Sequence, residues 1–498
     1  MHGDFSRDSY NLKNNFTRVL MQQGRLIVDA DWNEQSAIVF NYLQTLAADI
    51  IGWHGGANVT SDETEAPSGG AFAVSKNKNS SLKVSGGRYY VDGILIEWPV
   101  NKDGYEIEEL EPDSNLSDRI VIAKVWEEHI SEASDLTLQD SAFNGLDSCT
   151  RVRICVRFIA VPIEEMDRES LNSLLATENT FREFLKSTTG KPDSPLDFRP
   201  LHSNDMLPQL IASSSHNSLD PADCIEETNQ RYSGVENQLY RVEVHSGGTS
   251  FWDGLRTIDG HPQSKSDPQG IPAFDIDNPP VTLKWSRDNG SITYAASIEG
   301  NTATVTTPWH DESRAIQQGH WIELIKDDEA QGVMFQAGVV KKENGVTIIM
   351  LDVPADRSPA PPAGKVLIRR WDHQHRKHFP VTGTGGILVR KTVSNNENKS
   401  VAIPLEDNLF IQMFLPVEDG GNGEVSGAGF KAGDYWLIPA RAASGDIIWP
   451  VSKEKEKQAP ELVPARYTQH HYAPLAFIKD VNNATILDLR NNLSFHTD

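Results

Sequence analysis

Arg151-Val152-Arg153-Ile154-Cys155-Val156-Arg157-Phe158 is the stretch that decides the fold class. Its apolar side chains occupy every second position, and arginine fills most of the positions between them. A period of two is that of a β-strand with one face in a core and the other toward water. The stretch therefore predicts a β protein.

Similar strand patterns lie on both sides of it. Two short strands are expected within 81–98, and two Asn-Gly pairs, Asn289-Gly290 and Asn344-Gly345, favour the tight turns that close hairpins. Further candidates are 120–126, 240–244, 281–285, 320–325, 346–351, 365–371, 409–414 and 435–438. Many short strands without an internal repeat predict a mainly β protein with minor α, containing two or more small β-sandwich or barrel-like domains.

Two segments have helical periodicity instead. After an extended arm of about 30 residues, apolar side chains recur at three- and four-residue intervals up to Gly52, a suitable helix stop. Asp31, with Glu34 three residues later, matches a capping box. Residues 161–187 form the second helical segment. We expect five units: an arm and helix (1–56), a first β domain (57–160), a helical insertion and linker (161–230), a second β domain (231–372) and a third β-rich domain (373–498).

Charge and cysteine content exclude several classes of protein. The chain has 498 residues, 46 basic and 70 acidic, a net charge of −24, which argues against nucleic acid or anionic lipid as partners. Three cysteines, without paired spacing, do not support a disulfide framework. Because the sequence shows neither a secretory signal pattern nor a long apolar run, we expect no membrane span and a chain made in the cytoplasm.

Candidate chemistry is sparse. The chain has neither a Gly-x-Ser-x-Gly pentapeptide nor a P-loop. His373, His375 and His378 are weak candidates for a zinc site if they share a strand face, but Arg376 and Lys377 between them would repel a cation. We therefore predict no metal and no cofactor.

Two other patterns contain residue types that can carry chemistry. Paired carboxylates at Glu127-Glu128 or at 327–329 are the residue types that glycoside hydrolysis uses, although acidic loops are common in so acidic a chain. Trp252 and Trp309, outside the strand-like runs, are the candidates for an exposed sugar-stacking surface. The other tryptophans lie mostly within predicted strands, where core packing explains them.

A set of local motifs points to a family. Near the N-terminus stand Met1-x-Gly3-Asp4-Phe5-x-Arg7-Asp8, a Leu20-Met21-Gln22-Gln23-Gly24-Arg25 run, an Asp29-Ala30-Asp31-Trp32-Asn33-Glu34-Gln35 run, and Gly52-x-His54-Gly55-Gly56. Downstream stand Glu236-Asn237-Gln238-Leu239-Tyr240-Arg241-Val242-Glu243, Lys284-Trp285-Ser286-Arg287-Asp288-Asn289-Gly290 and Arg369-Arg370-Trp371-Asp372-His373. Together they resemble an uncharacterised family encoded in gene clusters for extracellular contractile injection systems, which are phage-tail-like particles. Segments 161–222 and 247–280 depart from it.

The resemblance implies a non-enzymatic structural component of such a particle, at the baseplate, its extension or the fibre attachment. Its partners would be other particle subunits and further copies of itself, and the particle would be released by lysis or retained. The residues expected to dock on a neighbour are Phe5, Arg7, Phe16, Arg18, Leu20, Met21, Gln22, Gln23, Arg25, Asp31 and Trp32, unless the arm packs on its own chain. Alternatives are a glycan- or receptor-binding adhesin and, third, a hydrolase tip or cargo.

Overall fold

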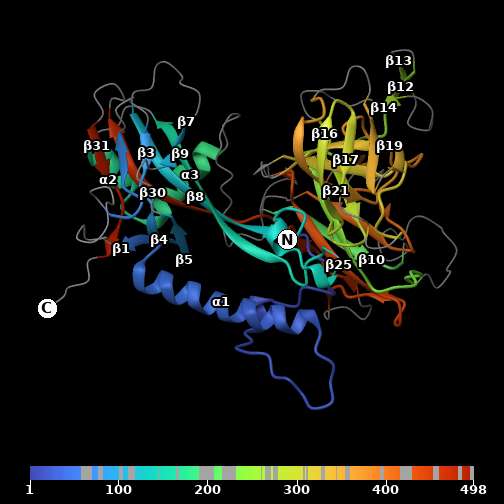
Figure 1. Ribbon diagram of the computed structural model, residues 1–498, viewed down its shortest axis with the longest axis horizontal. Helices are drawn as coiled ribbons and strands as arrows, with labels where there is room; N and C mark the ends of the chain where they lie inside the picture. The colour runs from blue at the N-terminus through green and yellow to red at the C-terminus, as the bar shows by residue number, and fades with distance from the viewer. Residues whose placement is uncertain are drawn as a thin grey trace.

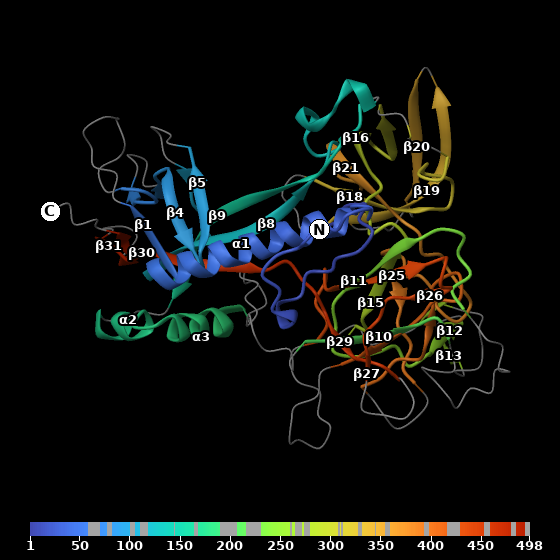
Figure 2. The same ribbon diagram turned by 90° about the horizontal axis from the view of Figure 1, so that it is seen from below.

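A computed structural model describes residues 1–57, 70–76, 82–99, 105–109, 118–143, 145–163, 168–189, 207–215, 231–258, 261–263, 271–272, 279–306, 309, 312–326, 331–343, 345–353, 359–392, 398–415, 429–452, 459–479 and 485–493. It has two lobes, joined by a long β-hairpin and by helix α1 (Asp29–Ile51), which lies outside the sheets (Figures 1 and 2). The predicted fold class, mainly β with an N-terminal helix and sandwich- and barrel-like units, is confirmed.

The first lobe combines three sheets and two helices. Its largest sheet packs one face on the other two sheets and the opposite face on helices α2 (Arg168–Leu174) and α3 (Glu178–Thr189). In spatial order the sheets are β31 (Thr485–Asp488), β30 (His470–Lys479), β8 (Asp118–Ile130), β9 (Arg151–Ile163), β7 (Glu108–Glu109); β32 (Asn492–Leu493), β1 (His54–Ala57), β4 (Gly87–Val91), β5 (Ile94–Trp98); and β2 (Val74–Lys76), β3 (Leu82–Val84), β6 (Tyr105–Glu106).

The second lobe consists of a sandwich and a closed barrel, each with its own apolar core. The sandwich sheets are β22 (Ile387–Leu388), β15 (Thr282–Ser286), β11 (Gln238–Ser246), β25 (Tyr435–Arg441), β26 (Asp446–Ile447), and β23 (Ile403–Pro404), β24 (Phe410–Phe414), β10 (Gln209–Ser213), β29 (Val463–Pro464). The barrel strands are β16 (Thr293–Glu299), β17 (Thr302–Val305), β20 (Val346–Asp352), β19 (Val333–Glu343), β18 (Trp321–Ile325), β21 (Gly364–Trp371).

Short elements complete the described chain. Strands β12 (Arg256–Ile258), β13 (His261–Gln263) and β14 (Ile271–Pro272) form one small sheet, and β27 (Val451–Ser452) pairs with β28 (Ala459–Pro460). Three 3₁₀ turns cover Leu12–Asn14, Leu136–Leu138 and Ser141–Phe143. The chain returns to earlier sheets late in the sequence, because β25 pairs with β11, and β30 pairs with β8.

The deciding stretch forms a longer strand than expected. It begins β9, which pairs with β8 from Ile130↔Arg151 to Asp118↔Ile163, a ribbon of about 40 Å. The expected division into one core face and one wet face holds only in the middle of the ribbon, where Ile154 and Val156 pack with Phe158 on the core of the first lobe. Both faces are exposed near Arg151, where the ribbon leaves the lobe, and most side chains of both faces are buried from Phe158 onward, between the sheets and helices.

Three local predictions need correction. Asn344 lies outside the described residues, but the β19–β20 hairpin that it was expected to close is present, whereas Asn289-Gly290 joins strands of different sheets. The helical segment 161–187 begins as strand β9 and then divides into two helices, because Thr177 accepts the backbone N–H of Thr180 and starts α3. Helix α1 begins at Asp29, two residues before the expected cap, and no side chain caps it. Its end at Gly52 is as predicted.

Candidate docking surface at the N-terminus

The N-terminal tip, residues 1–8, packs on its own chain. The carbonyl oxygen of Gly3 accepts a hydrogen bond from Nδ2 of Asn289 at 2.8 Å, and that of Met1 accepts one from Nη1 of Arg241 at 3.2 Å. Asn289 and Gly290 have φ angles of 55° and 64°, values that asparagine and glycine tolerate best. The turn between β15 and β16 thereby presents its buried amide to the tip.

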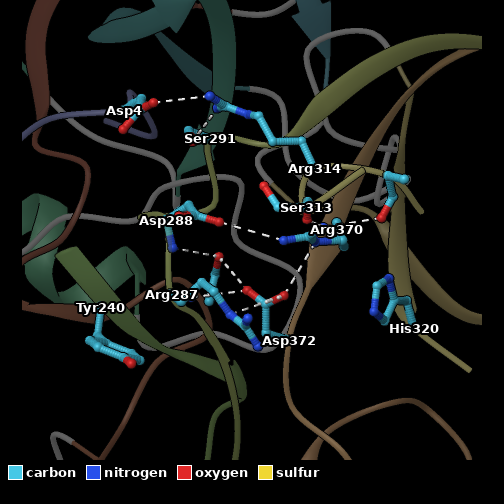
Figure 3. Close-up of polar contacts among 12 residues, drawn as sticks. Asp4, Tyr240, Arg287, Asp288, Ser291, Ser313, Arg314, His320, Arg370 and Asp372 are labelled. Atoms are coloured by element: carbon cyan, nitrogen blue, oxygen red, sulfur yellow. Dashed lines mark hydrogen bonds and ion pairs between the residues drawn. The ribbon is translucent and has the colours of Figure 1, made fainter. Parts of the chain in front are cut away.

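The next two residues of the tip connect the lobes. Oδ2 of Asp4 lies 3.0 Å from Nη1 of Arg314, and Nη2 of Arg314 donates to Oγ of Ser291 at 3.3 Å (Figure 3). The ring of Phe5 meets the imidazole of His129, at the end of β8, edge to face with 6.1 Å between the ring centroids. The tip therefore contacts the ribbon of the first lobe and the barrel side of the second.

The end of the tip is held by two arginines. Arg441 donates to the carbonyl oxygen of Ser6 at 2.8 Å, and Arg466 forms an ion pair with Asp8. Arg7 is half-buried and makes no ion pair with any described residue. Of the residues predicted to dock on a neighbour, Phe5 and Arg7 therefore lie in the part of the arm that packs on its own chain.

A buried ion cluster lies below the tip. Glu243 pairs with Arg241 at 2.6 Å and with Lys284 at 3.1 Å, and Glu323 pairs with Lys284 at 2.9 Å and with Arg369 at 3.6 Å. Burial by itself would raise the pKa of Glu243, but the charges of Lys284 and Arg241 hold it well below its ordinary value. The cluster thus joins three basic side chains to two carboxylates.

A second polar cluster supports the same turn. Arg370 bridges Asp372, at 3.2 Å from Nε, and Asp288, at 3.5 Å from Nη2 (Figure 3). Burial and the nearby charge of Asp372 raise the pKa of Asp288 to about 6. The hydroxyl of Ser286 and the backbone N–H of Arg287 both donate to Asp372. These partners hold one another, so both clusters fix the turn that receives the tip.

The outer loop, residues 9–28, leaves the protein and returns to its starting point. The backbone N–H of Ser6 donates to Oδ2 of Asp29 at 2.8 Å, so the two ends of the excursion touch. Between them, the loop is tied to α1 through Ser9, whose hydroxyl donates to Glu34 at 2.6 Å, and Val19, whose N–H donates to Gln35 at 2.8 Å. Arg18, Gln22, Gln23 and Arg25 are exposed.

Helix α1 shows a long apolar face to the surface. Only Ala30 and Ile38 are buried along it. The α1 stripe, defined here as Trp32, Val39, Leu43, Leu46 and Ile50, follows the alternating three- and four-residue spacing of a helix-packing seam, yet each member is 43% to 74% exposed. Asp31, in the first turn, is half-buried.

Loop and helix together form the main apolar surface of the described chain. Of the 25 large apolar side chains that are exposed, 14 lie in residues 12–50. They are Leu12, Phe16, Leu20, Met21, Leu26, Ile27, Val28, Trp32, Val39, Phe40, Tyr42, Leu43, Leu46 and Ile50. Sequence reasoning named four of them as docking residues, Phe16, Leu20, Met21 and Trp32. The apolar periodicity of α1 predicted most of the other apolar residues on the helix, but it did not show which side of the helix would be buried against the protein.

The contacts that hold the tip were missed as well. Asn289 and Arg241 stood in recognised motifs, but nothing in the sequence paired them with Met1 and Gly3. The charges of Glu243 and Lys284 within apolar strand patterns were the available signal, because a charge in a buried strand needs a partner.

The other candidate residues lie elsewhere. Trp252 is not exposed as expected: it is 3% exposed and donates from Nε1 to the carbonyl of Leu255. Trp309 is half-buried, 4.4 Å from the ring of Tyr294. Trp252 therefore presents no open face that could stack on a sugar, and Trp309 is only partly open.

The three candidate histidines do not share a strand face. Strand β21 ends at Trp371, before all of them. His373 is buried, with Nε2 2.7 Å from the carbonyl of Gly385, whereas His375 and His378 are exposed. Within the described ranges, no group of three or more metal-binding side chains is found.

The carboxylate candidates are placed only in part. Glu128 pairs with Arg153 on the exposed end of the ribbon at 2.8 Å, and Glu127 is exposed. Residues 327–329 lie outside the described residues. No described helix is long and apolar enough to cross a membrane.

Fold and surface define a class: a two-lobed, multi-sheet β protein whose N-terminal segment ties the lobes together and then exposes an apolar loop and helix. The chain belongs to the family of unknown function DUF6519, whose sequence profile matches residues 1–191 and 196–485. Comparison with curated proteins finds no match. Among solved structures, one entitled "Crystal structure of TssK" aligns with 80% of this chain and 99% of its own at 6% identity, with a TM-score of 0.17, which is too low to argue from.

Proposed function

We propose that this protein is a non-enzymatic structural subunit of a contractile, phage-tail-like injection particle, located at the baseplate, its extension or the fibre attachment. The outer loop and the α1 stripe bind a neighbouring subunit there. Support comes from the N-terminal motifs, which resemble a family encoded with such particles, and from the surface that those motifs build. The particle is assembled in the cytoplasm and is then released by lysis or retained.

The observation that carries the proposal is the concentration of exposed apolar side chains in residues 12–50. At roughly 80 Å² for each half-exposed large side chain, 14 of them present about 1,000 Å². A typical monomer exposes a largest apolar patch of about 300–600 Å². A surface of this size is that of a subunit with a partner, and about 800 Å² on each side is enough for a stable interface.

The division of the arm explains how the surface is presented. Residues 1–8 bind their own chain through Asn289, Arg241 and Arg314, which anchors the start of the loop. Helix α1 anchors its end. The loop therefore docks as a shaped excursion rather than a free tail, and less conformational entropy is lost on binding.

The proposal is tested in a strain that produces such particles. Leu20→Asp with Leu26→Asp, positions 69% and 92% exposed, places charges in the loop without disturbing a core. We expect particles purified from this strain to contain roughly tenfold less of the chain by mass spectrometry. The matched control is Val235→Asp in the second lobe, also 92% exposed, which should be incorporated normally.

Two results would refute the proposal. One is wild-type particles that never contain the chain, and the other is equal incorporation of the double variant and the control. A turnover by the purified chain that is lost on replacing Glu127 would instead favour a hydrolase. No exposed aromatic platform among the described candidates supports the adhesin alternative.

A further inference from the structure

Charge is divided between the two halves of the apolar surface. The outer loop, residues 9–28, contains Lys13, Arg18 and Arg25 and no acidic residue, which gives it a charge of +3. Helix α1 contains Asp29, Asp31, Glu34 and Asp49 and no lysine or arginine, which gives it a charge of −4. In a chain with a net charge of −24, a wholly basic segment next to a wholly acidic one is a specific feature.

The positive charges of the loop are not paired within the part of one chain that the structure describes. Lys13, Arg18 and Arg25 are exposed, and none forms an ion pair with a carboxylate of the described residues. The loop is tied to its own helix by the neutral side chains of Ser9 and Gln35. Its basic and apolar side chains remain available, and so does the α1 stripe.

We infer that the occupant of this surface is a second copy of the same chain, with the basic outer loop of each copy packed on the apolar α1 stripe of the other copy's acidic helix. The inference names the partner of the docking surface described above, but it needs no particle. Pairing the α1 stripes of two copies with each other is disfavoured, because it would bring together two helices that each carry a charge of −4. Loop against stripe brings +3 to −4 and buries apolar side chains on both sides.

The geometry is self-complementary. Each copy carries both halves of the interface, so a two-fold arrangement uses the contact twice, and a rotation of another order closes a ring. Each contact joins apolar loop residues such as Leu20 and Leu26 with Trp32 or Leu43 of the other copy. About 1,000 Å² of apolar side chain on each copy is then covered, which is the size of a stable homodimer interface.

The test uses the full-length chain and two charge-reversed variants. The loop variant, Lys13→Glu with Arg18→Glu and Arg25→Glu, changes the loop from +3 to −3. The helix variant, Asp31→Lys with Thr45→Lys and Asp49→Lys, changes α1 from −4 to +1. Both leave Asp29 and Glu34, which hold the loop ends, unchanged. Circular dichroism verifies that each variant is folded.

Sedimentation velocity at about 10 μM reports the assembly state. We expect the wild type to associate and each variant alone to associate roughly tenfold more weakly or worse, because loop and helix then carry like charges. Mixing the two variants should restore association, since each loop again meets a helix of opposite sign. Added salt should weaken the wild-type assembly.

Any of three outcomes would overturn the inference: a monomeric wild type at about 50 μM, association that neither reversal weakens, or a mixture that stays dissociated. A monomeric wild type that is still incorporated into particles would leave the proposed function intact and assign the surface to a different subunit. Restored association in the mixture, together with a wild type that is absent from particles, would support self-association and refute the proposed function.

Discussion

Replacing Glu323 by leucine tests how the buried ion cluster supports the second lobe. Glu323 is 1% exposed and accepts from Nζ of Lys284 at 2.9 Å, from Nε1 of Trp371 at 2.9 Å and from the N–H of Gly332 at 3.0 Å. Arg369 lies 3.6 Å away. Without the carboxylate, three cations face one anion, and the net charge of the buried cluster rises from +1 to +2.

Removing one partner of a buried ion pair costs about 3–5 kcal/mol. In this variant Arg369 loses its carboxylate partner and Lys284 keeps only Glu243. Since about 1.4 kcal/mol corresponds to a factor of ten, amide hydrogens of β15, β18 and β21 should exchange at least a hundredfold faster. Hydrogen exchange followed by mass spectrometry measures this strand by strand. It therefore does not depend on two-state unfolding of the whole chain.

A double variant separates charge from packing. Lys284→Met with Glu323→Leu returns the cluster to +1, so part of the protection should be recovered. Glu312→Leu is the control, since the pair of Glu312 with Lys342 is 3.6 Å long and largely exposed. Exchange within tenfold of the wild type in Glu323→Leu, or a double variant less protected than the single one, would refute the reasoning.

Three further predictions concern single positions. Gly93→Val should loosen α1 and speed its cleavage in limited proteolysis. Gly93 has φ +76°, and a Cβ there would lie 2.0 Å from the carbonyl oxygen of Gln44 in α1. Unchanged cleavage would contradict this packing. Asp288→Asn should flatten the pH dependence of the unfolding free energy. The pKa of Asp288 is raised in the folded state, from 3.8 to about 6, so its contribution is present below pH 3.8 and is lost as the pH rises through 6, by at most about 3 kcal/mol. Urea titrations at about pH 4 and pH 7 check this, and equal slopes for both proteins would contradict it. Asp31→Ala should hardly change the free energy of unfolding in urea or the helix content by circular dichroism, because the N-cap is Val28. A loss of about 1 kcal/mol or more in the free energy of unfolding would show that Asp31 caps the helix after all.

Strand periodicity predicted the β fold well, because the alternation of apolar side chains is written locally. It could not predict where Asn289-Gly290 would lie in the fold. Asn344-Gly345 stands in the sequence between β19 and β20, which pair as a hairpin. Asn289-Gly290 stands between β15 and β16, which belong to different sheets. The two cases differ in the partners of the flanking strands, and strand pairing over long sequence separations is not visible in a local pattern.

The sequence predicted which residue types make up the docking arm. It did not predict which of them pack on the chain itself and which remain exposed. Apolar and basic residues near the N-terminus indicated a docking arm, yet Phe5 packs on His129 while Phe16 remains exposed. That difference depends on the end of a ribbon more than 100 residues away in sequence. Likewise, the period of α1 indicated a helix with an apolar face, and only the tertiary structure shows that Ile38 faces inward and the α1 stripe outward.

The contact between Ser6 and Asp29 makes the segment between them a suitable place to insert additional residues. Because its two ends already touch, lengthening this segment changes only the loop-closure entropy, by about 0.6 kcal/mol for each doubling of its length. A peptide tag or a fluorescent label placed there would leave both lobes and the attachment of the tip undisturbed. Related chains could, by the same geometry, change the length and composition of this excursion, and with it their choice of neighbour, without rebuilding the fold that carries it.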